Sequence, residues 1–238
     1  MTKTTKIALV TGANKGIGKE IARQLGQQGV TVLVGARDIE RGERAAEEVG
    51  AVGSVRLDVT DAESVADAVK RVEHDFGRLD ILVNNAGIAL DRAPVTELPI
   101  EVLRQTYETN VFGVAAVTNA FLPLLRKSAS PRIVNVSSAL GSITAAANQD
   151  EASAGSRFLG YNSSKSALNA MTVIYANELR DAGVKVNAIN PGYCATDLNG
   201  HQGDLDPAQG AAVAVGVALS PDDGPTGEFH TEGGTLPW

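Results

Sequence analysis

The stretch Thr11–Gly18 reads TGANKGIG and follows the apolar run Lys6–Thr11, which has the composition of a buried strand. A helical pattern, Ile17–Gln28, begins where the stretch ends. A glycine-rich turn between a strand and a helix is the setting in which proteins bind dinucleotides, because the helix N-terminus offers free N–H groups to the phosphates. The spacing is G-x-x-x-G-x-G rather than the common G-x-G-x-x-G, and it does not match a Walker loop.

Each glycine of this turn has a steric reason to be there. Gly12 permits the tight turn, Gly16 lets the backbone approach a pyrophosphate, and Gly18 lets the helix pack close to the strand. An ordinary tight turn is the alternative, which the flanking strand and helix disfavour. The cofactor-binding residues that we expect in this turn are Gly12, Asn14, Lys15, Gly16, Ile17 and Gly18.

Outward from the turn, short apolar runs alternate with amphipathic stretches. The expected strands are Lys6–Thr11, Val30–Gly35, Ser54–Leu57, Asp80–Asn84, Arg132–Val136 and Lys185–Ile189. The expected helices are Ile17–Gln28, Ile39–Val49, Ala62–Phe76 (capped by Asp61), Ile100–Arg126 and Phe158–Asp181. The alternation predicts an α/β protein of the Rossmann type, with helices on both faces of a doubly wound, mostly parallel sheet. We expect seven strands in the order 3-2-1-4-5-6-7.

The composition narrows the function. Of the 238 residues, 43% are hydrophobic and 21% charged, which is ordinary for a globular protein, and we expect one domain over residues 1–238. The formal net charge of −7 argues against nucleic-acid or membrane partners. Cys194 has no partner for a disulfide, and no secretory signal is evident, so we expect a cytoplasmic protein. The three histidines lack metal-ligand spacing, so we expect no metal site.

The end of the second expected strand indicates which dinucleotide binds. An NAD site needs a carboxylate there for the ribose hydroxyls, whereas Arg37 offers a bidentate fork for a 2′-phosphate. Lys15 adds a second positive charge, and together they favour NADP(H). Asp38 is the competing ribose carboxylate, but we interpret it as the cap of the next helix.

Tyr161 and Lys165 stand four residues apart on an expected helix and therefore share one face. A phenol with its ordinary pKa near 10 exchanges protons poorly at neutral pH. A neighbouring ammonium group, together with a cationic nicotinamide ring, would lower that pKa where water is excluded. The pair alone is a weak signal, and its weight comes from occurring with the glycine turn. Together they indicate hydride transfer between a dinucleotide and a carbonyl or alcohol.

Further motifs give the chain a resemblance to the short-chain dehydrogenase/reductase family over essentially its full length. Thr11–Gly18 matches T-G-x-x-x-G-x-G, residues 84–87 match N-N-A-G, and Tyr161 and Lys165 match Y-x-x-x-K. The segments TGANKGIG, GARD, NNAGIA and GPTGEFHTEGGTLPW resemble the carbonyl-reductase branch.

The resemblance implies roles by position. Tyr161 would be the general acid/base, Lys165 would bind the nicotinamide ribose and lower the pKa of Tyr161, and Ser138 (with Ser137 as the alternative) would hold the substrate oxygen. Asn110 would support a water in a proton relay, although a helix bend is its alternative role. The remaining cofactor contacts that it implies are Asp58, Val59, Asn84, Ala86, Gly87, Pro191, Gly192 and Thr196.

One departure from the family is the long connection between Ser138 and Tyr161, whose extra residues near 144–158 we expect to form a loop beside the pocket. We expect a cofactor half over about residues 1–130 and a catalytic and substrate half over 131–238, in a monomer or small homo-oligomer. The expected activity is NADPH-dependent reduction of a ketone or aldehyde, and its reverse. The alternatives are an NAD-preferring alcohol or hydroxysteroid dehydrogenase acting oxidatively and a non-catalytic NADP-sensing protein.

Overall fold

A computed structural model of the chain describes residues 5–148 and 157–238. Its core is one eight-stranded sheet in the order β3-β2-β1-β4-β5-β6-β7-β8, parallel except for the β7–β8 pair. The first seven strands have the predicted order, and β8 is a two-residue addition at the edge. The strands are β1 (Ile7–Thr11), β2 (Thr31–Ala36), β3 (Gly53–Arg56), β4 (Ile81–Asn84), β5 (Arg132–Val136), β6 (Lys185–Ile189), β7 (Phe229–Thr231) and β8 (Gly234–Thr235).

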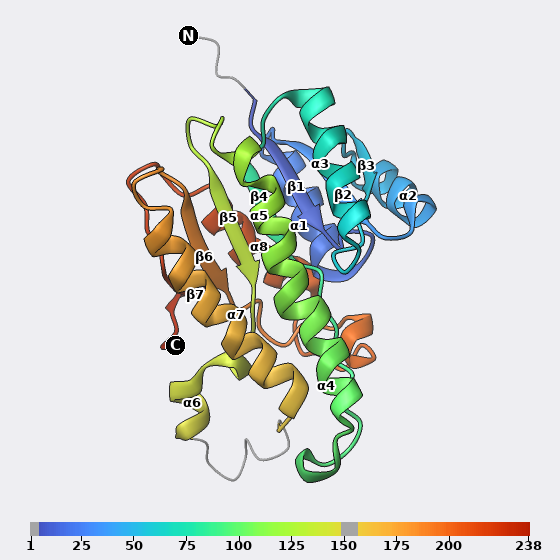
Figure 1. Cartoon of the computed structure of the whole chain (residues 1–238), viewed down its shortest axis with the longest axis vertical. Helices are drawn as coiled ribbons and strands as arrows, with labels where there is room; N and C mark the ends of the chain where they lie inside the picture. Colours follow the sequence, from blue (N-terminus) through green and yellow to red (C-terminus); the bar gives the residue numbers. More distant parts are fainter. Residues whose placement is uncertain (1–4, 149–156) are drawn as a thin grey trace.

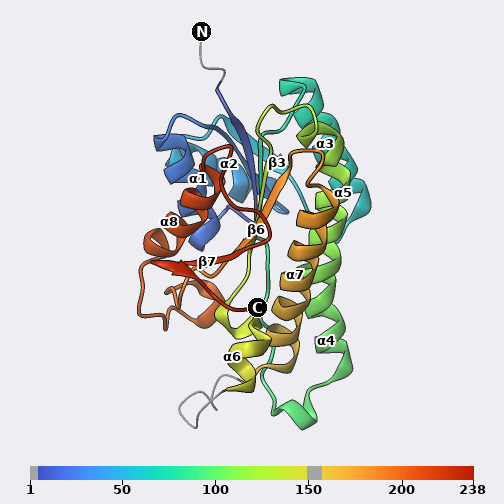
Figure 2. The same cartoon turned by 90° about the vertical axis from the view of Figure 1, so that its left-hand side faces the viewer.

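Helices cover both faces of the sheet (Figures 1 and 2). The α-helices are α1 (Gly16–Gln27), α2 (Ile39–Val49), α3 (Ala62–Phe76), α4 (Ile100–Tyr107), α5 (Gly113–Leu125), α6 (Ile143–Ala147), α7 (Leu159–Glu178) and α8 (Pro207–Ala218). In Figure 2, α1, α2 and α8 lie on one side of the sheet and α3, α5 and α7 on the other. No helix of the described residues has the length and apolar character that a bilayer-crossing segment needs.

Successive side chains along a strand point to opposite faces of the sheet, and each face has its own hydrophobic core. Val10 of β1 packs with α1, α2 and α8, whereas its neighbour Leu9 packs with α3, α5 and α7. Both side chains are fully buried, which explains why the strands are continuous apolar runs in the sequence. The caps also follow the prediction: Asp38 accepts a hydrogen bond from the Arg41 amide at the start of α2, and Asp61 accepts two at the start of α3.

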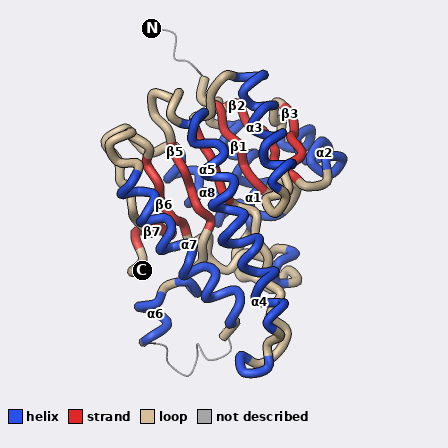
Figure 3. Tube along the Cα trace, in the orientation of Figure 1, coloured by secondary structure: helices blue, strands red, loops and turns tan. Residues whose placement is uncertain are grey.

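Three elements differ from the expectation. The predicted helix over 100–126 is interrupted by a π-helical turn, Glu108–Phe112, which divides it into α4 and α5. Helix α8 was not predicted, because its sequence PAQGAAVAVGVA is apolar on nearly every side and shows no helical periodicity. The connection after Ser138 is not a plain loop, since it contains the short helix α6, and residues 149–156 lie outside the described part of the chain. The tube in Figure 3 shows how these helices surround the strands.

Candidate active site

The carboxyl ends of the parallel strands open onto a cleft of about 450 Å³. Its walls come from the segments that follow β1, β2, β3, β4, β5 and β6, which is where ligands bind in open α/β sheets. Of the predicted site residues, those on the cleft are Gly12, Asn14, Lys15, Gly16, Ile17, Gly18, Arg37, Asp58, Val59, Ala86, Gly87, Tyr161, Lys165, Pro191 and Thr196. Those not on its wall are Asn84, Asn110, Ser138 and Gly192.

The glycine turn forms a cradle with its backbone. Gly12 has φ of +63°, and a Cβ there would lie 2.9 Å from the Ala86 Cα, so a side chain is excluded on both counts. A Cβ on Gly18 would lie 2.9 Å from the Gly12 carbonyl oxygen. Helix α1 starts after Lys15 without a side-chain cap, which leaves its first N–H groups directed at the cleft. These features fit the phosphates of a dinucleotide.

The charged residues at the adenosine end are arranged around Arg37. Burial raises the pKa of Asp58, but hydrogen bonds from Thr60 and the charges of Arg37 and Arg56 outweigh this and lower it overall. The Asp58 carboxylate therefore stays ionised at neutral pH. Asp38 is used as the cap of α2, so the carboxylate that would favour NAD already has a structural partner.

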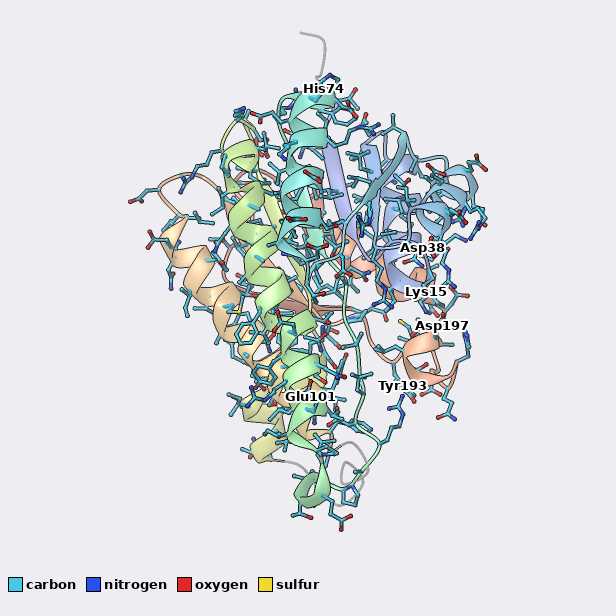
Figure 4. All side chains as sticks on the ribbon, turned by 45° about the vertical axis from the view of Figure 1, so that its right-hand side comes forward. Lys15, Asp38, His74, Glu101, Tyr193 and Asp197 are labelled. Atoms are coloured by element: carbon cyan, nitrogen blue, oxygen red, sulfur yellow. The ribbon has the colours of Figure 1, made fainter. Side chains whose placement is uncertain are left out.

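Lys15, which we expect to add positive charge at the cofactor site, lines the cleft and forms an ion pair there. Its Nζ lies 2.5 Å from Asp197 Oδ2, and both side chains are about half exposed. Figure 4 shows the two residues adjacent, with Asp38 and Tyr193 on the same side of the molecule and His74 at the far end. The ion pair links the glycine turn to the segment after β6, so any phosphate contact by Lys15 competes with Asp197.

Tyr161 and Lys165 both line the cleft, and Ser138 lies behind its wall next to Tyr161. A hydrogen bond joins the hydroxyl groups of Ser138 and Tyr161. Lys165 Nζ lies 5.6 Å from the centre of the Tyr161 ring and donates a 2.8 Å hydrogen bond to the Val136 carbonyl oxygen. Both functional side chains come from the first two turns of α7, and Ser138 follows β5.

Burial dominates the electrostatics here. It raises the pKa of Tyr161, and the hydrogen bond with Ser138 lowers it only in part. It lowers the pKa of Lys165 from 10.5 to about 8. Without the nicotinamide ring, Lys165 does not lower the Tyr161 pKa, because the ammonium is held by the Val136 carbonyl and burial has the larger effect. The lowering by ammonium and nicotinamide together stays a prediction.

Two predicted residues are held by buried hydrogen-bond partners. Asn84 is 3% exposed, and its amide donates to Thr118 Oγ1 on α5 at 3.0 Å and to Asn135 Oδ1 on β5 at 2.9 Å. The next residue, Asn85, lines the cleft instead and donates to the Thr11 carbonyl at 2.9 Å. Ser137, the alternative to Ser138, is on the cleft wall, but it is 2% exposed and donates to Asn169 Oδ1 at 2.6 Å.

Asn110 sits in the π-helical turn and is fully buried. Its side chain accepts from the Ile88 amide and donates to the Ile88 carbonyl, both at 2.9 Å, and also donates to Ser164 Oγ at 3.0 Å. A Cβ on Gly87 would lie 3.3 Å from Asn110 Oδ1 and 3.6 Å from Lys165 Nζ, so Asn110 and Lys165 flank the same backbone. Asn110 thus fastens the segment after β4 to α7.

Other residues that line the cleft were not predicted individually from the sequence. Ile88, Ala89, Leu90 and Arg92, which follow the N-N-A-G motif, line the cleft. Of the extra residues near 144–158, which we expected beside the pocket, those that the structure describes do not line the cleft. The remaining lining residues lie one or two positions from a predicted one; they are Leu57, Thr60, Asn85, Thr109, Val136, Asp197 and Leu198.

These features define a dinucleotide-binding oxidoreductase site, and comparisons with known proteins agree. The model of the short chain dehydrogenase family matches residues 6–205, so the chain belongs to this family. It is an oxidoreductase of the class that acts on carbonyl and alcohol substrates. A (+)-neomenthol dehydrogenase from Capsicum annuum is 32% identical over an alignment 303 positions long, which covers 96% of this chain and 96% of that protein.

Solved structures agree in fold and in the kind of ligand. An NADPH-bound carbonyl reductase from chicken fatty liver superposes with a TM-score of 0.86 at 28% identity, covering 98% of this chain and 99% of that one. A 3-ketoacyl-(acyl-carrier-protein) reductase from Brucella melitensis, complexed with NADH, gives a TM-score of 0.83 at 28% identity. The match covers 95% of this chain and 96% of that one. Family members therefore bind nicotinamide dinucleotides of both kinds.

Proposed function

We propose that this protein is an NADPH-dependent reductase of ketones or aldehydes, acting reversibly, with Tyr161 as the general acid/base. The observation that carries the proposal is that Tyr161, which is hydrogen-bonded to Ser138, and the buried Lys165 line the same cleft as the glycine turn. Residues 1–130 would hold the cofactor, and 131–238 would supply the catalytic groups, within one domain.

The cofactor preference follows from the charges at the adenosine end. Arg37 lines the cleft and Asp38 caps α2, so a 2′-phosphate would meet a guanidinium group rather than a carboxylate. Asp58 and Val59 would lie beside the adenine, and the free N–H groups of α1 would bind the pyrophosphate. Lys165 would contact the nicotinamide ribose, with Pro191 and Thr196 over the ring. Bound NADPH supplies the hydride.

The protein's own groups supply the proton. The Ser138 hydroxyl group would hold the carbonyl oxygen of the substrate. It lies beside the Tyr161 hydroxyl, with which it shares a hydrogen bond. Because burial keeps the Tyr161 pKa raised, the phenol is protonated at neutral pH and ready to donate to that oxygen. Asn110 holds α7 against the segment after β4 through Ile88 and Ser164.

The substrate is proposed only by class. Ile88, Ala89 and Leu90 give the cleft an apolar wall, which favours a hydrophobic carbonyl compound. The similarity to a (+)-neomenthol dehydrogenase and a carbonyl reductase supports the same class. Cyclic ketones such as menthone therefore belong in the first panel of substrates to be tested.

The test is turnover of NADPH, followed by its loss of absorbance, with a panel of ketones and aldehydes and a parallel series with NADH. The Tyr161→Phe variant should lose roughly 10²- to 10⁴-fold in kcat. It should retain NADPH affinity, measured by fluorescence titration, because the ring and helix stay in place. Undiminished turnover in this variant would remove the mechanism, and NADPH binding without turnover of any carbonyl would favour a sensing role.

A further inference from the structure

Helix α7, which carries Tyr161 and Lys165, begins without a cap of its own. Its N-cap residue, Phe158, makes no side-chain hydrogen bond, and the first turn holds no acidic residue. The first N–H groups of an α-helix have no partner inside the helix and need acceptors from elsewhere. An unsatisfied N–H group in a buried position costs about 1–3 kcal/mol. The start of this helix therefore depends on a residue from another part of the chain.

Asp91 supplies the missing acceptors from the segment after β4. Its carboxylate accepts from the Gly160 amide at 2.7 Å and from the Tyr161 amide at 3.1 Å. These are the second and third residues of the helix, the positions that an N-cap side chain normally serves. Asp91 is only 5% exposed, and its negative charge faces the positive end of the helix dipole.

The segment that carries Asp91 is itself part of the cleft. The cleft is lined by the three residues before Asp91, which are Ile88, Ala89 and Leu90, and by the next residue in the sequence, Arg92. The Arg92 guanidinium group donates to the Asp91 carbonyl oxygen at 2.8 Å. The Asp91 side chain thus joins the cleft wall to the backbone of the residue that we propose as the acid/base.

We propose that Asp91 is a positioning residue: its carboxylate holds the first turn of α7 against the wall of the cleft and thereby places the Tyr161 hydroxyl for proton transfer. The inference rests on the proposed function. Because the hydrogen bond is to the amide of Tyr161 itself, a shift of the helix start moves the reacting oxygen directly. A misplacement of about 1 Å can lower a rate by roughly 10²-fold without loss of binding.

The variant that tests this is Asp91→Asn, which keeps the shape of the side chain. An amide has one oxygen, so one of the two helix N–H groups would face an NH₂ donor in place of an acceptor. The matched control is Asp80→Asn. Asp80 is 6% exposed, accepts from the Ile7 amide at 2.8 Å and lies at the opposite end of the sheet, before β4.

With menthone or another active carbonyl from the panel, Asp91→Asn should lower kcat at least 10-fold and leave the NADPH Kd within threefold of wild type. Asp80→Asn should lower the melting temperature and leave kcat within twofold. The inference is overturned if Asp91→Asn keeps kcat within twofold, or if its kcat and NADPH affinity fall together. Absence of wild-type turnover would instead reject the proposed function, and this inference with it.

A second variant decides the question if Asp91→Asn does not fold. In Gly160→Ala, the added Cβ would lie 3.1 Å from Asp91 Oδ2 and 3.3 Å from both Asp91 Oδ1 and Thr106 Oγ1, so the carboxylate would have to shift by a few tenths of an ångström while the aspartate remains. The expected result is again a drop in kcat of about 10-fold or more with NADPH affinity retained. Wild-type kcat in a folded Gly160→Ala protein would contradict the positioning role.

Discussion

Replacing Lys165 by methionine should make the protein more stable at pH 7 while abolishing its activity. The Lys165 ammonium is buried, and burial lowers its pKa from 10.5 to about 8. At about 1.4 kcal/mol per pH unit, keeping this group charged costs the folded protein about 3 kcal/mol relative to a lysine in water. Methionine has a similar length and no charge, so that cost disappears.

An opposing effect reduces the gain. Lys165 Nζ donates to the Val136 carbonyl at 2.8 Å, and removing the donor leaves a buried acceptor at a cost of about 1–3 kcal/mol. The expected net result at pH 7 is a gain of about 1 kcal/mol in the free energy of unfolding. A stabilised but inactive variant is typical of a residue retained for function.

The stability difference between wild type and Lys165→Met should depend on pH. Between pH 8 and 10.5 the folded wild type has lost the Lys165 proton while the unfolded chain still binds it, so wild-type stability rises with pH in this window. The variant lacks this rise, because the group is absent. Its advantage should therefore shrink by about 2–3 kcal/mol between pH 7 and 10 and change sign.

The assay is urea unfolding of wild type and Lys165→Met at pH 7 and pH 10, where all other titrating groups cancel in the difference. Lys70→Met is the control, because the Lys70 side chain is 76% exposed and its removal exposes no buried acceptor. If the difference between wild type and Lys165→Met did not change with pH, Lys165 would not be the desolvated ammonium that the structure indicates.

Three further outcomes are expected. Arg37→Asp should reverse the preference for NADPH over NADH in kcat/KM, and an unchanged ratio would place the 2′-phosphate elsewhere. Asp197→Asn should release Lys15 and tighten NADPH binding about two- to fivefold at low salt, an effect that should fade at high ionic strength in fluorescence titration. Asn84→Ala should reduce the free energy of unfolding by about 2–3 kcal/mol without changing the NADPH Kd, because its buried hydrogen bonds join β4 to α5 and β5, away from the cleft.

The sheet could be predicted from the sequence because each strand and helix is encoded in its own short stretch of residues. Buried parallel strands read as short apolar runs and the helices between them as amphipathic stretches, so order and crossover direction follow from known rules. The caps Asp38 and Asp61 were predicted for the same reason, since a cap bonds to its own helix. Helix α8 was missed because it is apolar all round, although Asp206 and Gln209 form a capping box that could have revealed it.

The differences within the site come from partners that are distant in sequence. Asn110 bonds to Ile88, and the helix opens into a π turn at that point. Asn84 and Asn85 are adjacent, and only the exact end of β4 decides which one faces the cleft. The acceptor of Lys165, the Val136 carbonyl, lies 29 residues away on β5. No pattern in the chain indicates such contacts, because they depend on how separate elements pack.

The protonation of the site bears on the direction of catalysis. Burial raises the pKa of Tyr161 and lowers that of Lys165 to about 8, so near pH 7 the phenol is neutral and the amine still mostly charged. Reduction of a carbonyl consumes one proton, which a neutral phenol can donate, whereas oxidation of an alcohol needs the phenolate as a base. This protonation state supports the reductive direction that we propose. Oxidation would depend on a lower Tyr161 pKa, to which the positive charge of the oxidised cofactor would contribute without moving Lys165 from the Val136 carbonyl.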